Sequence, residues 1–131
     1  MFRNSLDVTQ ENNLFVLVGA GVYSYECRTP NTQNFTSSVF VSGYTINKAS
    51  NPVNLYLNSL LNQIISINYH QQINSTGKSS AGIINLFRDG NIVNIENGLN
   101  ISLSPWLYIY KVNSTGNQNY TENSTGLTFT V

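Results

Sequence analysis

The residues in this chain most suited to chemistry are asparagines. Asn-X-Ser/Thr, with X other than proline, is the acceptor pattern for N-glycosylation, and composition alone would produce about four such sites. The chain has six: Asn34, Asn74, Asn100, Asn113, Asn119 and Asn123. Five fall in expected loops, and Asn100 points outward from an expected strand. Each acceptor can therefore reach solvent, and all six are candidate glycosylation sites.

Catalytic and metal-binding patterns are missing. The six acids are scattered along the chain and form no obvious acid–base pair; they are Asp7, Glu11, Glu26, Asp89, Glu96 and Glu122. No flanking motif joins Cys27 to His70 as a thiol–imidazole couple, and one cysteine with one histidine cannot complete a zinc site. We expect Cys27 to be at least half-buried and His70 to be structural. The chain is expected to be non-enzymatic, with no catalytic residue, metal or cofactor.

Composition excludes several kinds of partner. Of 131 residues only 9% are charged, and six Lys/Arg balance six Asp/Glu, whereas an ordinary domain is about 25% charged. The basic residues are dispersed, so no direct contact with nucleic acid is expected. No apolar run is long enough for a transmembrane helix. Near-zero charge suits a subunit that packs against copies of itself.

The elements that position the candidate residues are predicted from the alternation of apolar and polar residues along the chain. Strand patterns with a period of two occur at Leu14–Val18, Val22–Arg28, Ser38–Ile46, Val53–Leu57, Gln63–Gln72, Ile83–Phe87, Asn91–Glu96, Leu99–Leu103, Trp106–Val112 and Leu127–Val131. Trp106–Val112 is apolar on both faces and is expected to be a central, covered strand. The pattern predicts an all-β fold: a single-domain antiparallel β-sandwich of jelly-roll type, with about 8–10 short strands.

Turn signals refine this prediction. Asp89-Gly90 and Asn97-Gly98 suit tight hairpin turns and predict a meander from Ile83 to Leu103. Residues 52–66 are expected to form two strands, with a short helix at 52–62 as the alternative, because Pro52 follows a possible cap. Asn-Ser-Thr-Gly occurs three times, from Asn74, Asn113 and Asn123, and is expected to form loops. No internal repeat of domain size is expected.

The domain prediction has three parts. Residues 1–13 are expected to form a polar arm, and 14–131 the β-sandwich, with a long polar loop at 113–126. Leu14–Val22 has the length of a secretory-signal core, but acids outnumber Arg3 before it, so a strand is expected instead. We expect the last strand to complete its own sheet; the alternative is that the strand, like the arm, pairs with a neighbour's edge. This makes Phe2, Arg3, Leu6, Phe129 and Val131 the candidate assembly residues.

The Asn-Ser-Thr-Gly segments and the alternating strands from Ile83 to Val112 resemble those of structural proteins of viruses that infect thermoacidophilic archaea. That resemblance implies a single jelly-roll coat protein, glycosylated in some cases. The first hypothesis is therefore a virion coat or spike subunit that forms homo-oligomers, joins other structural proteins of the particle and is located in the virion or at an extracellular surface. The alternatives are an extracellular filament subunit joined by strand donation and a carbohydrate-binding β-sandwich that uses Tyr108, Tyr110 and Tyr120.

Overall fold

The protein is all-β, as expected, but it divides into two units. A computed structural model describes all residues, Met1–Val131, and separates a unit of Met1–Lys48 from a unit of Ala49–Val131. No strand of one unit pairs with a strand of the other. The predicted division was elsewhere, after residue 13. The supposed arm belongs to the N-terminal unit because its residues pair with the first long hairpin.

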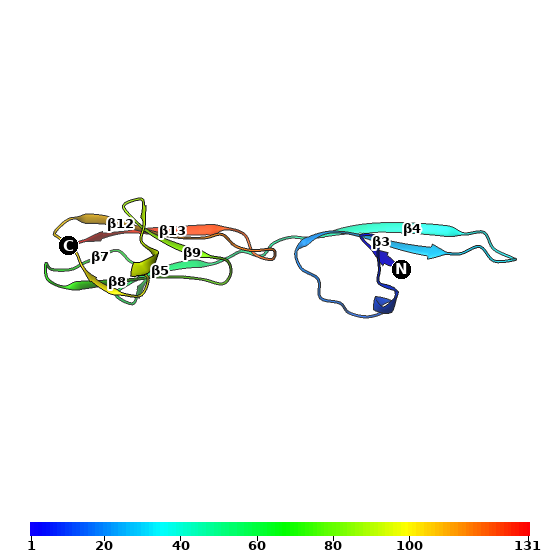
Figure 1. Ribbon diagram of the computed structural model, residues 1–131, viewed down its shortest axis with the longest axis horizontal. Helices are drawn as coiled ribbons and strands as arrows, with labels where there is room; N and C mark the ends of the chain where they lie inside the picture. The colour runs from blue at the N-terminus through cyan, green and yellow to red at the C-terminus, as the bar shows by residue number, and fades with distance from the viewer. The chain divides into compact units, whose positions relative to one another are not determined.

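The N-terminal unit is one small sheet without a second sheet against it (Figure 1). Its elements are β1 (Phe2–Arg3), β2 (Leu6–Asp7), the 3-10 helix η1 (Thr9–Glu11), β3 (Gly21–Thr29) and β4 (Ser38–Ile46). The strand order is β2-β1-β3-β4. β3 and β4 form a nine-residue antiparallel ladder. Val8 is the only buried residue of this unit.

The C-terminal unit is a sandwich of two sheets (Figure 1). Its elements are β5 (Val53–Leu57), β6 (Leu60–Leu61), β7 (Ile65–Ser66), β8 (Gln72–Ser79), β9 (Ile84–Arg88), β10 (Asn91–Ile92), η2 (Asn94–Glu96), β11 (Asn100–Ser102), β12 (Leu107–Ser114) and β13 (Asn123–Thr130). One sheet has the order β10-β9-β12-β13-β7 and the other β11-β8-β5-β6. All pairs are antiparallel except β13 with β7.

The sandwich has a conventional apolar core. Alternate residues of β5 and β8 pack against those of β9, β12 and β13, which places eight buried side chains between the sheets: Val53, Leu55, Leu57, Ile73, Leu86, Tyr110, Val112 and Phe129. A buried polar cluster closes one end. Asn51 Nδ2 donates to Ala81 O (3.0 Å) and Ser114 Oγ (3.1 Å), and the Ala81 N–H donates to Asn51 Oδ1 (3.2 Å).

Several local predictions are confirmed. Residues 52–66 form strands and no helix, as expected, although there are three strands and not two: 53–57, 60–61 and 65–66. β12 is the central strand of its sheet, and the last strand pairs within its own sheet, over eight residues with β12. The outer face of β12 is not covered, however: Leu107 and Ile109 are 52% and 57% exposed. The loop after β12 is shorter than expected, because β12 continues to Ser114 and β13 begins at Asn123.

Other local predictions are wrong. Leu14–Val18 contains no strand, most of Gln63–Gln72 lies outside strands, and Asn91–Glu96 contains a 3-10 turn. Two of the three Asn-Ser-Thr-Gly segments lie in strands β8 and β13, and the third begins in β12. The segment in β8 is a strand because its small residues face the core. A Cβ on Gly77 would lie 2.5 Å from Val112 Cγ2, so only glycine fits there.

The chain also contains an internal repeat, contrary to expectation. Residues 1–46 align without gaps on residues 86–131 at an offset of 85. Twelve of the 46 positions are identical: Phe2, Arg3, Val8, Glu11, Asn12, Leu14, Tyr23, Tyr25, Gln33, Asn34, Thr36 and Thr45 in the first copy. Conservative pairs include Phe35 with Tyr120 and Tyr44 with Phe129.

The backbones of the two copies match in register. Arg3 pairs with Tyr25 and Arg88 with Tyr110, while Tyr23 pairs with Tyr44 and Tyr108 with Phe129. Equivalent turns carry equivalent hydrogen bonds. The Tyr23 hydroxyl donates to Gly19 O (2.8 Å), and the Tyr108 hydroxyl donates to Ser104 O (2.9 Å). The N-terminal unit therefore has the structure of one half of the sandwich, the C-terminal half, Leu86–Val131.

Candidate assembly surface

The N-terminal unit exposes a face that the sandwich buries. Opposite residues of an antiparallel pair lie on the same face of a sheet, so the register places Tyr23, Tyr25, Cys27, Phe40 and Tyr44 together. Tyr44 lies between two tyrosine rings, 5.5 Å from that of Tyr23 and 5.6 Å from that of Tyr25, centroid to centroid. Phe40 is 71% exposed and Tyr44 43%. We call these five residues the aromatic face.

The equivalent residues of the sandwich are its core. Tyr110, Val112 and Phe129 correspond to Tyr25, Cys27 and Tyr44, and each is fully buried. The rings keep the same arrangement, with Phe129 6.0 Å from Tyr108 and 6.2 Å from Tyr110. The difference is that β5 and β8 cover this face in the sandwich, while no second sheet covers it in the N-terminal unit.

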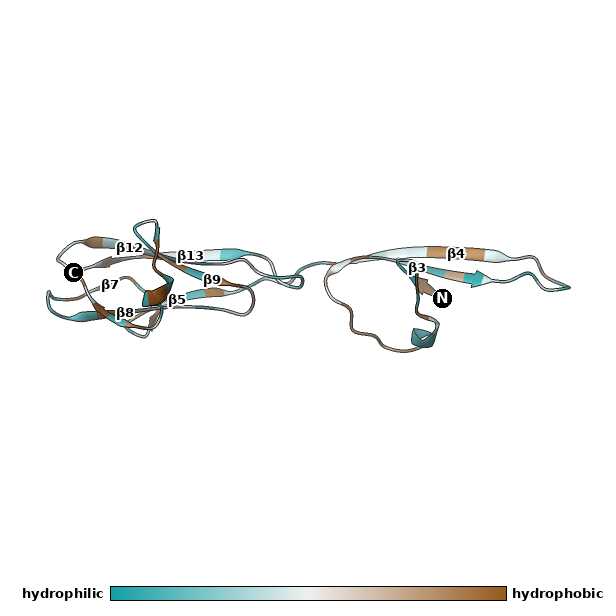
Figure 2. Ribbon diagram, viewed as in Figure 1, coloured by the Kyte–Doolittle hydropathy of each residue, from teal (hydrophilic) through white to brown (hydrophobic).

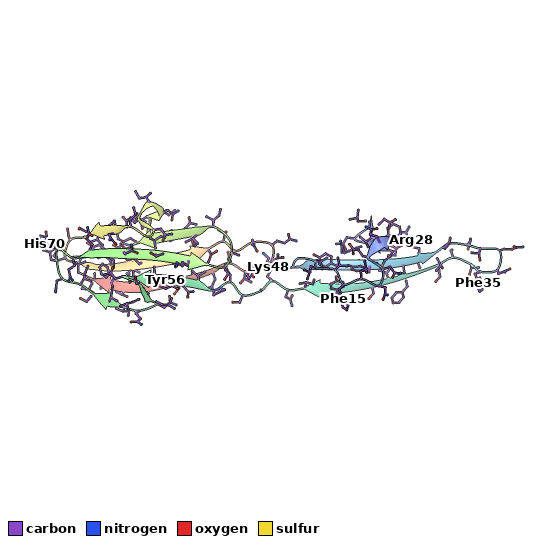
Figure 3. All side chains as sticks on the ribbon, turned by 90° about the horizontal axis from the view of Figure 1, so that it is seen from below. Phe15, Arg28, Phe35, Lys48, Tyr56 and His70 are labelled. Atoms are coloured by element: carbon purple, nitrogen blue, oxygen red, sulfur yellow. The ribbon has the colours of Figure 1, made fainter.

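The same unit has a second exposed apolar segment. Phe15 and Leu17 are completely exposed and Val16 is 43% exposed, in a stretch without strand pairing. Figure 3 labels Phe15 on the segment before β3 and Phe35 in the loop between β3 and β4. At the equivalent position of the sandwich, β11 pairs with β8 over three residues. Residues 15–17 therefore have a strand sequence but no partner strand.

Polar groups around the aromatic face repeat as well. Arg3 Nη1 lies 2.7 Å from Glu11 Oε2, and Arg88 Nη1 lies 2.7 Å from Glu96 Oε2. Arg3 Nη1 also donates to the Tyr25 hydroxyl (3.2 Å), which lowers the pKa of Tyr25. Burial instead raises the pKa of Tyr110 from its ordinary value of 10.0, although Arg88 and Ser75 act in the opposite direction. The pKa values of these two equivalent tyrosines therefore shift in opposite directions, down without a covering sheet and up beneath one.

The β4 strand adds an unprotected edge. It lies at one end of its sheet, its nine residues include no charge and no proline, and Val39, Phe40 and Val41 are 59%, 71% and 56% exposed. Figure 2 shows this hydrophobic stretch in brown. Long apolar edges of this kind are templates for pairing with another chain, and proteins usually block them with charges, prolines or bulges.

The candidate assembly residues separate into two groups. Phe2, Arg3 and Leu6 lie in the N-terminal sheet, where Leu6 is 65% exposed and the Arg28 guanidinium lies 4.8 Å from the centre of the Phe2 ring. Phe129 is fully buried in the sandwich core, so its side chain cannot contact a neighbour. The Val131 N–H donates to Trp106 O (3.0 Å).

Sequence reasoning missed Phe15, Leu17 and the aromatic face. The signal that would have found them is the 85-residue repeat. Once β12 and β13 are identified as the equivalents of β3 and β4, the exposed aromatic residues of β3 and β4 are recognised as equivalents of buried core residues.

The six candidate glycosylation sites differ in accessibility. Asn34, in the β3–β4 loop, and Asn119 occupy equivalent repeat positions, and both are exposed. Asn100 is exposed in β11. The other three are more constrained. Asn74 Nδ2 donates to Gly98 O and Asn100 Oδ1, Asn123 Nδ2 donates to Asn51 O, and Asn113 Oδ1 is buried.

Three other candidate residues lie in environments that differ from those expected from the sequence. Cys27 is exposed, not half-buried as expected, because its face is uncovered. His70 lies in the turn between β7 and β8 with a φ of 73°, not on a strand. Tyr110 of the supposed sugar-binding surface is buried in the core. No three His, Cys, Asp or Glu side chains cluster where a metal ion could bind. A hollow of about 330 Å³ on the C-terminal unit has only Lys111 and Glu122 as charged lining residues.

Comparisons with known proteins do not assign the chain to a group. No family model, curated protein or solved structure matches it. None of its helices is both long and apolar enough to span a bilayer. The exposed surface of the N-terminal unit is therefore the feature of the chain that points to a function.

Proposed function

We propose that the protein is a non-enzymatic structural subunit that assembles through its N-terminal unit. The observation that supports this is the aromatic face: three of its five equivalents, Tyr110, Val112 and Phe129, are fully buried in the core of the sandwich. In the N-terminal unit the equivalent apolar side chains are still in contact with water. A partner that covers them would gain about 25 cal/mol of free energy for each Å² of apolar surface buried. A two-stranded hairpin alone is marginally stable in water, and only β3 and β4 of this sheet are longer than two residues, so association would also stabilise the unit.

The proposed contact favours an extended assembly. The surface belongs to one unit only, and its equivalent in the other unit is already covered. A partner that covers this face with a second sheet, as β5 and β8 do in the sandwich, contributes a different surface and makes the contact heterologous. Heterologous contacts generate rings if the rotation closes and filaments if it does not. A filament or spike subunit, including one from a virion, fits this geometry. The exposed Asn34 and Asn119 sites would suit glycosylation of its outer surface.

Light scattering and negative-stain electron microscopy on the full chain test this proposal. We expect oligomers, threads or rings whose mass increases with protein concentration. The double variant Phe15→Asp/Leu17→Asp should be monomeric, because it places two charges at fully exposed positions without disturbing a core. The matched control is Ile95→Asp, a charge at an 85% exposed position of the sandwich. It should assemble normally. A chain that stays monomeric at every concentration would overturn the proposal.

A further inference from the structure

We propose that the aromatic face binds a strand layer of the same kind as Ala49–Asn85, supplied from outside these 131 residues. This inference rests on the proposed function and names the partner of that surface. In the sandwich, Ala49–Asn85 contains β5 to β8 and the start of β9. Its β5, β6 and β8 cover the face of Leu86–Val131, and its β7 pairs with β13 at the edge of the covered sheet. We call Ala49–Asn85 the strand layer.

Counting the parts of the repeat supports an outside partner. The chain contains two copies of the half that needs covering, Met1–Ile46 and Leu86–Val131, but only one strand layer. That layer already packs against the second copy. A second molecule of the same chain adds two further halves and one further layer, so exchange between identical molecules always leaves one half of each uncovered. The missing component is another layer.

The register predicts the strand contacts of such a layer. In the sandwich, Asn100–Ser102 pairs with Gln72–Asn74 of β8. Phe15–Leu17 is the equivalent of Asn100–Ser102, so it should pair in the same way with the added layer. This explains why Leu14–Val18 has an alternating strand sequence and no strand: its partner is missing.

Two more contacts follow from the repeat. The Gly77 N–H donates to Asn97 Oδ1 (2.9 Å), and Asn12, the identical residue of the first copy, has an exposed side chain without such a contact. Cys27 replaces Val112, which packs against Gly77, so Cys27 should face a small residue of the added layer.

The chemistry of the surface fits a neutral apolar layer. Its charged groups, Arg3 and Glu11, already pair with each other, so they create no demand for a charged partner. The layer of this chain matches that requirement: between residues 49 and 85 only Lys78 is charged, and it is exposed. Phe40 stands where the sandwich has Thr125, so the natural layer should have more space at that position than Ala49–Asn85 has.

Reaction of Cys27 with a maleimide provides the test, since it is the only cysteine. We would extend the full chain by placing a second copy of Ala49–Asn85 directly before Met1, so that Met1 follows the layer as Leu86 does. At concentrations where the 131-residue chain is monomeric, Cys27 should react rapidly. In the extended chain it should react about a hundredfold more slowly, because modification would require local opening.

Two matched variants serve as controls. Cys27→Ser/Val112→Cys in the 131-residue chain moves the thiol to the equivalent position beneath the existing layer and should be protected. In the extended chain, Leu55→Asp/Leu57→Asp in the added layer alone should restore the fast reaction of Cys27, because both leucines are fully buried in the sandwich.

Each outcome is decisive. If Cys27 of the extended chain reacts as fast as in the 131-residue chain while Val112→Cys is protected, the layer proposal is wrong. Protection of Cys27 in the 131-residue chain, with a dimeric mass, would show that two aromatic faces pair with each other and would also overturn it. A monomeric 131-residue chain with a protected extended chain would overturn self-association but support the layer.

Discussion

Tyr25 and Tyr110 occupy equivalent positions of the repeat. Each pairs with an equivalent arginine and lies beside an equivalent aromatic ring, yet only Tyr110 is fully buried. The hairpin, the turn and the Arg–Glu ion pair therefore form in the N-terminal unit without a covering sheet. What the second sheet adds is burial of the aromatic face and a partner strand for residues 15–17. Local sequence determines the half-sandwich, and the layer determines its core.

The largest expected difference concerns the central aromatic residue of each copy. Phe129→Ala removes a fully buried ring and should lower the free energy of unfolding of the C-terminal unit by about 3–5 kcal/mol. Tyr44→Ala, the equivalent change at a 43% exposed position, should leave that transition unchanged. Urea unfolding followed by the fluorescence of Trp106, the only tryptophan, measures both. If both variants lowered the free energy of unfolding by the same amount, the two aromatic residues would be in similar environments, which would contradict the comparison.

A second substitution tests the contact between the layer and the half-sandwich. Gly77→Ala places a Cβ 2.5 Å from Val112 Cγ2 and should destabilise the sandwich by about 1–3 kcal/mol. Val112→Ala provides space, so the double variant should be more stable than the sum of the single effects by about 1 kcal/mol. The same unfolding experiment measures this coupling. Additive effects would contradict the close approach from which we infer a small residue opposite Cys27.

Tyrosine ionisation should distinguish the two copies by pH. Arg3 lowers the pKa of Tyr25, whereas burial raises that of Tyr110 above its ordinary value of 10.0. A raised pKa in the folded state stabilises the fold below the ordinary value, and this contribution is lost as the pH rises through the folded pKa. Tyr110 should therefore contribute to unfolding only in strong alkali. Titration of absorbance near 295 nm, with Tyr25→Phe and Tyr110→Phe for assignment, should show Tyr25 ionising first.

The smallest expected effect isolates the cause of the Tyr25 shift. Arg3→Met removes the hydrogen bond to the Tyr25 hydroxyl and should raise the pKa of Tyr25 toward its ordinary value. Lys48→Met, a control that removes a positive charge elsewhere in the unit, should leave it unchanged. Covering the aromatic face in the extended chain should raise the pKa of Tyr25 further, by desolvation.

Much of the fold could be predicted from alternation alone. The pattern placed β3, β4, β5, β9, β12 and β13 to within a few residues, because a strand with one buried face needs a period of two. The Asn-Ser-Thr-Gly segments were misassigned because their turn propensity was overridden by packing: in β8, Ser75 and Gly77 are small residues facing the core. Propensity of this kind yields to tertiary context.

The candidate site could be predicted only in part. Phe2, Arg3 and Leu6 were identified from the idea of an arm, and they do lie in the N-terminal unit. Leu14–Val18 has the sequence of a strand, but a strand forms only beside a partner strand. The alternation of apolar and polar residues does not reveal whether that partner is present. The repeat was readable, since Phe-Arg, Glu-Asn, Tyr-X-Tyr and Gln-Asn-aromatic-Thr recur at the same offset. With twelve identities in 46 positions, the repeat is hard to recognise until the matching residues are seen to share one offset of 85.

Amide hydrogen exchange on β3 and β12 tests most directly whether a covering layer is the only difference between the two copies. In the 131-residue chain, we expect slow exchange across Leu107–Ser114 and fast exchange across Gly21–Thr29 under conditions that keep the protein monomeric. In the chain extended by Ala49–Asn85 before Met1, exchange across Gly21–Thr29 should slow to approach that of Leu107–Ser114. Fast exchange of Gly21–Thr29 in the extended chain, with Leu107–Ser114 still protected, would contradict the account.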